Sequence, residues 1–308
     1  MMRNLVIAGY SGYTSVDKVD NFIESFLKIK LPHDEIIICY SGEETEINSY
    51  LDNHNIKQVK LTEQSYSKYV SRFKWFSDVI DAEIYDKVVC ADIRDVVFQY
   101  NPFTWMFDNQ KKPLLVCDEG FKHKEEPWNQ MAMQGAFPDW KDEMMEKNVF
   151  NVGVIGGDAS EVKSMCKRIF KKCQTISIWN HTYEGNKYEV VPDQVGFSIL
   201  INLERKLTMS GDLIQPLSNE SSWCVTTASV EYSTLDLRVI GGKMCNPNGQ
   251  EYCLVHQYDR LGDLELVYDF KTQKFTLQGE EFFKISFESG KGKTLETLNE
   301  SRVSIGRL

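Results

Sequence analysis

The chain lacks a long hydrophobic segment, and its positive charge is not concentrated anywhere. No run among its 308 residues approaches the roughly 18 to 20 consecutive apolar residues that a membrane-spanning helix needs. The apolar opening, residues 1–8, is too short for a signal peptide. We therefore expect a cytoplasmic protein with no membrane span. The formal net charge is −10 without any stripe of Lys and Arg, so we expect no nucleic acid among the partners.

Motifs that would indicate several other functions are also missing. The eight cysteines form no C-x-x-C pair, which argues against zinc and thioredoxin-like centres. Gly9-x-x-Gly12 stands where a dinucleotide-binding oxidoreductase would carry G-x-G-x-x-G. An aspartyl phosphotransferase would carry two aspartates two residues apart near the first strand, and Asp92 comes too late for that. A sugar-nucleotide pyrophosphorylase would have a broadly similar α/β fold but usually carries a glycine-rich loop with an arginine near its N-terminus. Residues 9–14 contain no Arg or Lys, which disfavours this class.

The first half of the chain contains alternating strand and helix patterns. Apolar runs typical of strands occur at residues 5–8, 35–39, 56–61, 87–91 and 114–117. Helical spacing of apolar residues lies between them, at residues 16–30, 43–53 and 69–80. This order predicts an α/β protein with a Rossmann-like, mostly parallel central sheet flanked by helices.

The second half of the chain is more mixed. Residues 148–155 indicate a strand, and the segment after it has the apolar stripe of a core-facing helix. Asp158 and Glu161 have the spacing of a capping box at the start of that helix. Pro192 suits the first turn of a further helix over residues 193–203.

The end of the chain has the pattern of a small β appendage. Residues 267–270 and 274–277 flank turn-forming residues and predict a β-hairpin. No low-complexity linker separates the parts. We expect one catalytic domain over residues 1–262, with residues 263–308 forming a C-terminal hairpin and tail that pack on it.

The segment Asp92-Ile93-Arg94-Asp95 directly follows the apolar strand 87–91. Val, Cys and Ala in that strand are typical of a buried parallel strand, and ligands bind at the carboxyl ends of such strands. Paired carboxylates hold hard divalent cations, which in turn bind phosphate oxygens. The alternative is a solvated turn with an ordinary Asp–Arg pair.

Four motifs follow one another along the chain. The first is the aspartate motif D-I-R-D-V-V-F-Q-Y-N-P-F at residues 92–103, preceded by S-R-F-K-W-F at 71–76. The others are N-V-G-V-I-G-G at 151–157, Asp193-Gln194, and V-H-Q-Y-D-R at 255–260. In this order the motifs resemble nucleotide-sugar glycosyltransferases of the GT-A fold. The resemblance covers about residues 5 to 260 and implies a GT-A-like catalytic domain.

The resemblance implies a Mn²⁺ or Mg²⁺ site. Asp92 would contact the metal or the ribose, Asp95 would ligate the metal, and His256 would complete the set. The usual motif has its second carboxylate two residues after the first, where this chain has Arg94. Which aspartate is the main ligand, and whether Arg94 partly replaces the metal, therefore stays open. By its residues alone, His256 would be a buried core imidazole beside Leu254 and Val255; the motif around it favours the metal-binding role.

Further residues are candidates for binding the nucleotide-sugar. Gly9 permits close backbone approach after the first strand, and Tyr10 or Tyr13 could stack on a base; an ordinary glycine-containing turn is the alternative. Arg72 is suited to the diphosphate, or is a solvated helix residue. Arg94 belongs to this group through the aspartate motif.

Two acids are candidates for catalysis. Asp193 opens a predicted helix, where an aspartate serves either as a cap or, by the resemblance, as a base or sugar-binding residue. Glu119 follows a predicted strand and is the second candidate. By the same resemblance, Asn151, Gly153 and Gln194 are expected to contact the nucleotide-sugar.

These features favour a metal-assisted glycosyltransferase. The expected partners are a nucleotide-diphosphate sugar, with UDP or GDP as the nucleotide, and a glycan, glycolipid or protein acceptor. A non-catalytic carbohydrate- or nucleotide-binding protein of the same fold is the main alternative, since the altered aspartate motif is compatible with a lost metal. A sugar-nucleotide pyrophosphorylase is the other.

Overall fold

The computed structural model describes residues 3–65, 67–177, 179–183, 186–203, 213–233, 236–260, 266–269, 271–277, 281, 283–288 and 292–297. The chain divides into two compact units, each built from three separate segments. Unit 1 comprises Met1–Val16, His33–Ala91 and Gln110–Pro216, and unit 2 comprises Asp17–Pro32, Asp92–Asn109 and Leu217–Leu308. The boundary predicted after residue 262 falls within residues 261–265, outside the described residues.

The central sheet of unit 1 has seven strands in the order β10-β6-β7-β4-β1-β2-β3. These are β1 (Arg3–Ser11), β2 (Asp34–Ser41), β3 (Lys57–Lys60), β4 (Tyr85–Asp92), β6 (Leu114–Lys122), β7 (Asn148–Asp158) and β10 (Ile214–Ser218). β2 runs parallel to both β1 and β3, whereas β7 runs antiparallel to both β4 and β6. The α/β class is confirmed, but the prediction of a mostly parallel sheet is wrong because apolar runs identify strands without giving their direction.

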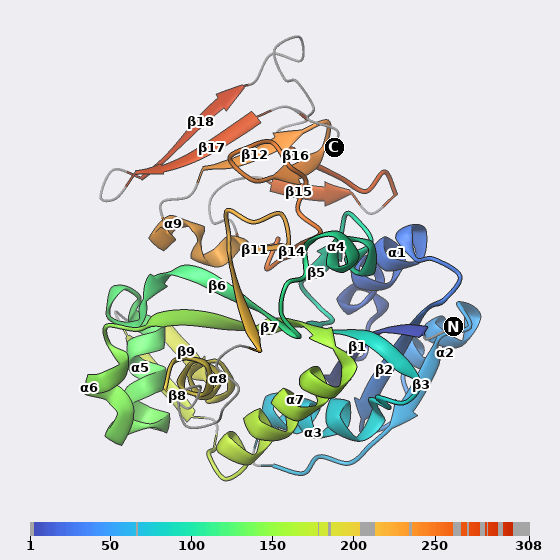
Figure 1. Ribbon diagram of the computed structural model, residues 1–308, viewed down its shortest axis with the longest axis horizontal. Helices are drawn as coiled ribbons and strands as arrows, with labels where there is room; N and C mark the ends of the chain where they lie inside the picture. The colour runs from blue at the N-terminus through green and yellow to red at the C-terminus, as the bar shows by residue number, and fades with distance from the viewer. Residues whose placement is uncertain are drawn as a thin grey trace. The chain divides into compact units, whose positions relative to one another are not determined.

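Helices flank this sheet (Figure 1). They are α2 (Glu46–Asn53), α3 (Lys68–Val79), α5 (Pro127–Ala136), α6 (Lys141–Met144), α7 (Ala159–Cys173) and α8 (Asp193–Asn202). α7 packs along α3, and α8 packs against β7 and α7. Val162, Cys166 and Ile169 of α7 are fully buried, as the apolar stripe predicts. The described residues of unit 1 also include a hairpin of β8 (Trp179–Tyr183) and β9 (Asn186–Val190) and the 3₁₀ turns His123–Glu125 and Pro138–Trp140.

Two predicted helix starts differ in the structure. Asp158 is the N-cap of α7 but makes no capping hydrogen bond, because its Oδ1 accepts from Lys87 Nζ and Gln110 Nε2 instead. The predicted capping box is therefore absent. Pro192 is the N-cap of α8, one position before the first helical turn in which it was expected.

Unit 2 is built on a three-stranded sheet with the order β11-β14-β5. Its strands are β5 (Val96–Phe98), β11 (Cys224–Thr226) and β14 (Leu254–His256), with β14 antiparallel to β5 and parallel to β11. Helix α1 (Asp20–Ile29) packs on β5, where the rings of Phe22 and Phe26 each lie 5.2 Å from the ring of Phe98.

Two smaller sheets belong to the same unit. One contains β13 (Lys243–Cys245), β12 (Leu237–Ile240), β17 (Phe283–Glu288) and β18 (Gly292–Thr297) in that order. The other pairs β15 (Leu266–Asp269) with β16 (Lys274–Leu277) antiparallel, which confirms the predicted hairpin. The other helical segments among the described residues are α4 (Pro102–Asn109), α9 (Val230–Ser233) and the 3₁₀ turns Val16–Lys18 and Thr227–Ser229, the first of which begins at the end of unit 1.

Within the described part of the chain, no helix has the length and apolar character needed to cross a membrane.

Candidate functional site

Strand pairing in unit 2 brings two distant parts of the sequence together. Asp92 ends β4, Asp95 immediately precedes β5, and His256 ends β14. In the antiparallel register, Val96 lies opposite His256, and Gln257 N donates to Asp95 O at 2.6 Å. This register places the Asp95 side chain beside the imidazole across the two strands.

The side chains of Asp92, Asp95 and His256 form a compact cluster. His256 Nε2 lies 3.5 Å from Asp92 Oδ2 and 3.6 Å from Asp95 Oδ1. One potential ligand atom from each residue lies within 4.8 Å of the others. Asp95 and His256 are 4% and 1% exposed, whereas the Asp92 side chain is 25% exposed and gives the cluster access to solvent.

Two arginines define the charge state of Asp95. Arg260 Nη2 donates to Asp95 Oδ2 at 2.7 Å and Arg94 Nη2 to the same oxygen at 3.2 Å. Burial alone would favour the neutral acid, but the charges of His256, Arg260 and Arg94 together hold the pKa of Asp95 below its usual value. Asp95 is thus a carboxylate whose Oδ2 is held by arginine while Oδ1 faces the imidazole.

The donor set of the cluster suits a divalent cation. Two carboxylates and one imidazole are ligands that Mn²⁺ accepts, and Mg²⁺ prefers the oxygens among them. Three protein ligands leave the other positions of a six-coordinate cation to water or to substrate oxygens. Arg94 Nη2 also lies 3.8 Å from Asp259 Oδ2.

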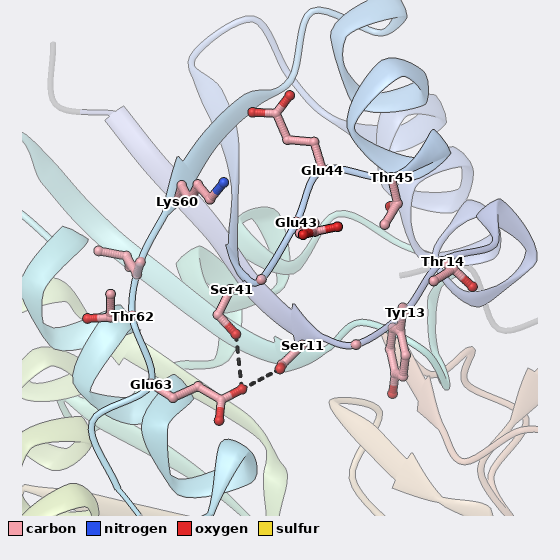
Figure 2. A pocket seen from close by; sticks show the side chains of 13 residues that line it. Ser11, Tyr13, Thr14, Ser41, Glu43, Glu44, Thr45, Lys60, Thr62 and Glu63 are labelled. Atoms are coloured by element: carbon pink, nitrogen blue, oxygen red, sulfur yellow. Dashed lines mark hydrogen bonds between the residues drawn. The ribbon is translucent and has the colours of Figure 1, made fainter.

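A separate pocket of about 940 Å³ lies in unit 1. Residues 11–14, 41–45 and 60–63 line it, and these follow or end the parallel strands β1, β2 and β3 (Figure 2). Their carboxyl ends share one edge because Ser11 pairs with Ser41 and Tyr40 pairs with Lys60 in the sheet register. This is the edge at which α/β sheets bind ligands.

Glu63 is anchored within that pocket. The hydroxyls of Ser11 and Ser41 both donate to Glu63 Oε1 (Figure 2). With two donors on one oxygen, the Glu63 carboxylate has a fixed position beside the ends of β1 and β2.

The three residues predicted around the first strand have different environments. Tyr13 lines the pocket, half-buried, with its ring parallel to that of Tyr10 at 6.2 Å. Tyr10 is buried and donates to Asn48 Oδ1 at 3.2 Å; burial raises its pKa to about 12. A Cβ at Gly9 would come within 3.3 Å of Cys39 O, so this glycine permits close packing of strand on strand.

Arg72 and Asp193 are brought together from α3 and α8. Arg72 Nη2 donates to Asp193 Oδ2 at 3.2 Å, and the two side chains are 13% and 5% exposed. Arg72 is therefore not a solvated helix residue. Asp193 is the first residue of α8 rather than its cap. Its Oδ1 accepts from Gln194 N at 3.0 Å while its Oδ2 accepts from Arg72, so the carboxylate serves both the helix end and the ion pair.

The remaining predicted residues of unit 1 form short polar contacts. Asn151 Nδ2 donates to Glu119 Oε1 at 2.6 Å, and Gly153 N donates to Asn151 Oδ1 at 2.7 Å. Glu119 and Asn151 are both buried. Gln194 Nε2 donates to Asn129 Oδ1 at 3.3 Å.

The structure thus groups the predicted residues into separate constellations: the carboxylate–histidine cluster, the Arg72–Asp193 pair and the Glu119–Asn151 pair. Sequence reasoning missed Arg260 and the pocket residues Ser41, Glu43 and Glu63. Arg260 is the last residue of the V-H-Q-Y-D-R segment at 255–260, four residues after His256. The pocket residues would have been found by considering the carboxyl ends of the second and third predicted strands as well as the first.

No protein-family model and no curated protein sequence matches the chain. The functional assignment therefore depends on the chemistry of these constellations.

Proposed function

We propose that this chain is a metal-assisted glycosyltransferase that transfers a sugar from a nucleotide-diphosphate sugar to a glycan, glycolipid or protein acceptor. The observation that carries the proposal is the convergence of Asp92, Asp95 and His256 from segments far apart in the sequence. A polar cluster at the end of a buried strand adds little to the hydrophobic core, so a ligand-binding role explains it better than stability does.

Loss of a nucleoside diphosphate leaves negative charge on its terminal phosphate oxygens. A Mn²⁺ or Mg²⁺ ion held by the cluster would stabilise that charge as a Lewis acid. Asp95 is suited to the task because it is ionised and its orientation is fixed by Arg94 and Arg260. The two guanidiniums are about half exposed, so they can also bind phosphate oxygens directly.

Unit 1, taken by itself, also contains groups suited to binding a sugar or a nucleoside. Asp193, held by Arg72, and Glu119, held by Asn151, are carboxylates with fixed positions, as a general base or a sugar-binding residue requires. The pocket at the ends of β1, β2 and β3 offers room for the nucleoside.

Isothermal titration with Mn²⁺ and Mg²⁺ tests the metal site. We expect one site that binds Mn²⁺ in the wild-type protein and is lost in Asp95→Asn and His256→Ala. Asp259→Asn is the matched control, since it removes a carboxylate beside Arg94 that does not belong to the cluster. Wild-type affinity in both cluster variants would refute the proposed metal site.

Donor turnover separates a transferase from a binding protein. With saturating Mn²⁺, slow hydrolysis of one nucleotide-diphosphate sugar, accelerated by a carbohydrate acceptor, supports the transferase. Binding of the nucleotide-sugar without release of nucleotide under any acceptor would refute catalysis and indicate the non-catalytic alternative.

A further inference from the structure

The pocket of unit 1 is rich in hydrogen-bond acceptors. Three carboxylates, from Glu43, Glu44 and Glu63, line it together with a single cation, Lys60. Its charge disfavours a phosphate group and favours a neutral ligand with several N–H or O–H donors. The diphosphate end of a nucleotide therefore does not belong in this pocket, whereas a base with a donor-rich edge does.

The carboxylates have different orientations. Glu63 Oε1 is occupied by the Ser11 and Ser41 hydroxyls, and Glu44 Oε1 accepts from Tyr40 Oη at 3.3 Å. In Figure 2 the Glu43 carboxylate stands inside the ring of lining side chains, whereas Glu44 points outward from it. Glu43 is exposed, so both of its oxygens can receive donors from a ligand.

We propose that this pocket binds guanine and that the sugar donor is a GDP-sugar, an assignment that rests on the proposed function and specifies its donor. Guanine carries O6, N1–H and N2–H₂ along one edge. Its two adjacent donors match the two oxygens of the Glu43 carboxylate, as a guanidinium does. O6 matches the ammonium of Lys60, which lines the same pocket from the end of β3.

The other bases fit this arrangement poorly. Uracil has one donor between two carbonyl oxygens, and adenine has an amino group beside an unprotonated nitrogen. Either base would place a lone pair against one carboxylate oxygen, which costs binding free energy instead of contributing to it. Tyr13, which lines the same pocket, supplies an aromatic face on which the base can stack.

Titration of the full-length protein with GDP, IDP, UDP and ADP in the presence of Mn²⁺ tests the assignment. IDP differs from GDP only in lacking the N2 amino group, so we expect GDP to bind about tenfold to a hundredfold more tightly than IDP. UDP and ADP should bind at least as weakly as IDP. Repeating the GDP and IDP titrations in EDTA should preserve their ratio, because the metal does not touch the base.

Substitutions at two neighbouring residues test whether Glu43 causes the preference for GDP over IDP. Glu43→Gln should reduce the GDP/IDP ratio to near one, because an amide cannot accept both donors. Glu44→Gln removes the same charge one residue away and should leave the ratio as in the wild type. A GDP preference that survives in Glu43→Gln would overturn the role of Glu43.

The remaining outcomes separate this inference from the proposed function. Tighter binding of UDP than of GDP would overturn the guanine assignment and leave the glycosyltransferase proposal intact. Equal weakening of all four nucleotides in Glu43→Gln, with 2′-deoxy-GDP unaffected, would mean that the carboxylate binds ribose and would also overturn it. Binding of no nucleotide would refute both proposals.

Discussion

Among single residues, His123 shows what burial alone does to a titratable group. Its side chain is fully buried, and neither ring nitrogen has a hydrogen-bond partner among the described residues. The imidazolium would lose its hydration there, so burial lowers the pKa of His123 to about 4. The folded protein consequently holds this histidine neutral at pH values where the unfolded chain protonates it.

This difference predicts a loss of stability in mild acid. Between pH 6.5 and about 4 the unfolded state binds the extra proton, so the free energy of unfolding falls as the pH decreases. From pH 7 to pH 5 the His123 contribution to that fall is about 2 kcal/mol. Urea denaturation of the wild type and of His123→Leu at both pH values measures it. An identical acid-side loss in the two proteins would contradict the prediction.

The Arg72–Asp193 pair makes a second prediction. If Asp193 only capped α8, Asp193→Asn would leave the free energy of unfolding nearly unchanged, since Asn caps as well as Asp. Because Asp193 instead pairs with a mostly buried guanidinium, we expect the substitution to lower the free energy of unfolding by about 1 to 3 kcal/mol. In a double-mutant cycle, Arg72→Gln combined with Asp193→Asn should cost less than the two single changes together. Additive costs would show that the pair contributes no coupling.

At the level of elements, the aspartate motif contains structural residues as well as candidate ligands. Gln99 is buried; its Nε2 donates to Met244 O and Tyr252 O, and its Oε1 accepts from Met244 N, at 2.8 to 2.9 Å. Asn101 Oδ1 accepts from Phe103 N and Thr104 N at the start of α4. The amide side chains of Gln99 and Asn101 thus hold β5 and the start of α4 in place.

Gln99→Leu should therefore destabilise the protein without directly altering the cluster of Asp92, Asp95 and His256. It leaves Met244 N and Tyr252 O without their amide partner in a buried region, at a cost of about 2 to 4 kcal/mol. Gln64→Leu, at an exposed glutamine, should change the free energy of unfolding by less than about 0.5 kcal/mol. The folded Gln99→Leu protein should bind Mn²⁺ as the wild type does, and a specific loss of metal affinity would contradict a purely structural role.

The elements also show which parts of the fold can be predicted from sequence. Helix α7 and the strands β1, β2 and β4 follow from long apolar patterns, and the structure contains them. β5 and β14 are three residues each and lie far apart in the chain, so no local pattern predicts that they pair. The grouping of Asp95 with His256 was expected only from the resemblance to a family; the physical reason for it is this pairing. The orientation of β7 was missed because strand direction is set by tertiary contacts.

For the whole molecule, the proposed metal ligands Asp92, Asp95 and His256 all belong to unit 2, so a bound cation should act locally. We expect saturating Mn²⁺, at about 100 times its dissociation constant, to add about 2.7 kcal/mol to the opening free energy of the segments that hold it. Hydrogen exchange should slow by about a hundredfold in peptides spanning residues 92–98 and 254–257. Peptides from β1 and β2 serve as the internal control. Uniform slowing of exchange across the chain, or no slowing in the peptides spanning residues 92–98 and 254–257, would contradict the assignment. Removal of the metal with EDTA should reverse the effect.

The interleaving of the two units has a consequence for biosynthesis. The chain enters unit 2 at Asp17, leaves it after Pro32, and returns to it twice later. Helix α1 leaves the ribosome early, but β5, against which its phenylalanines pack, is translated later, and β14, which pairs with β5, later still. A nascent chain therefore carries a helix with an uncovered apolar face while much of unit 1 is being made, which exposes it to aggregation. Chaperones that shield apolar segments during translation should accordingly raise the yield of the folded protein.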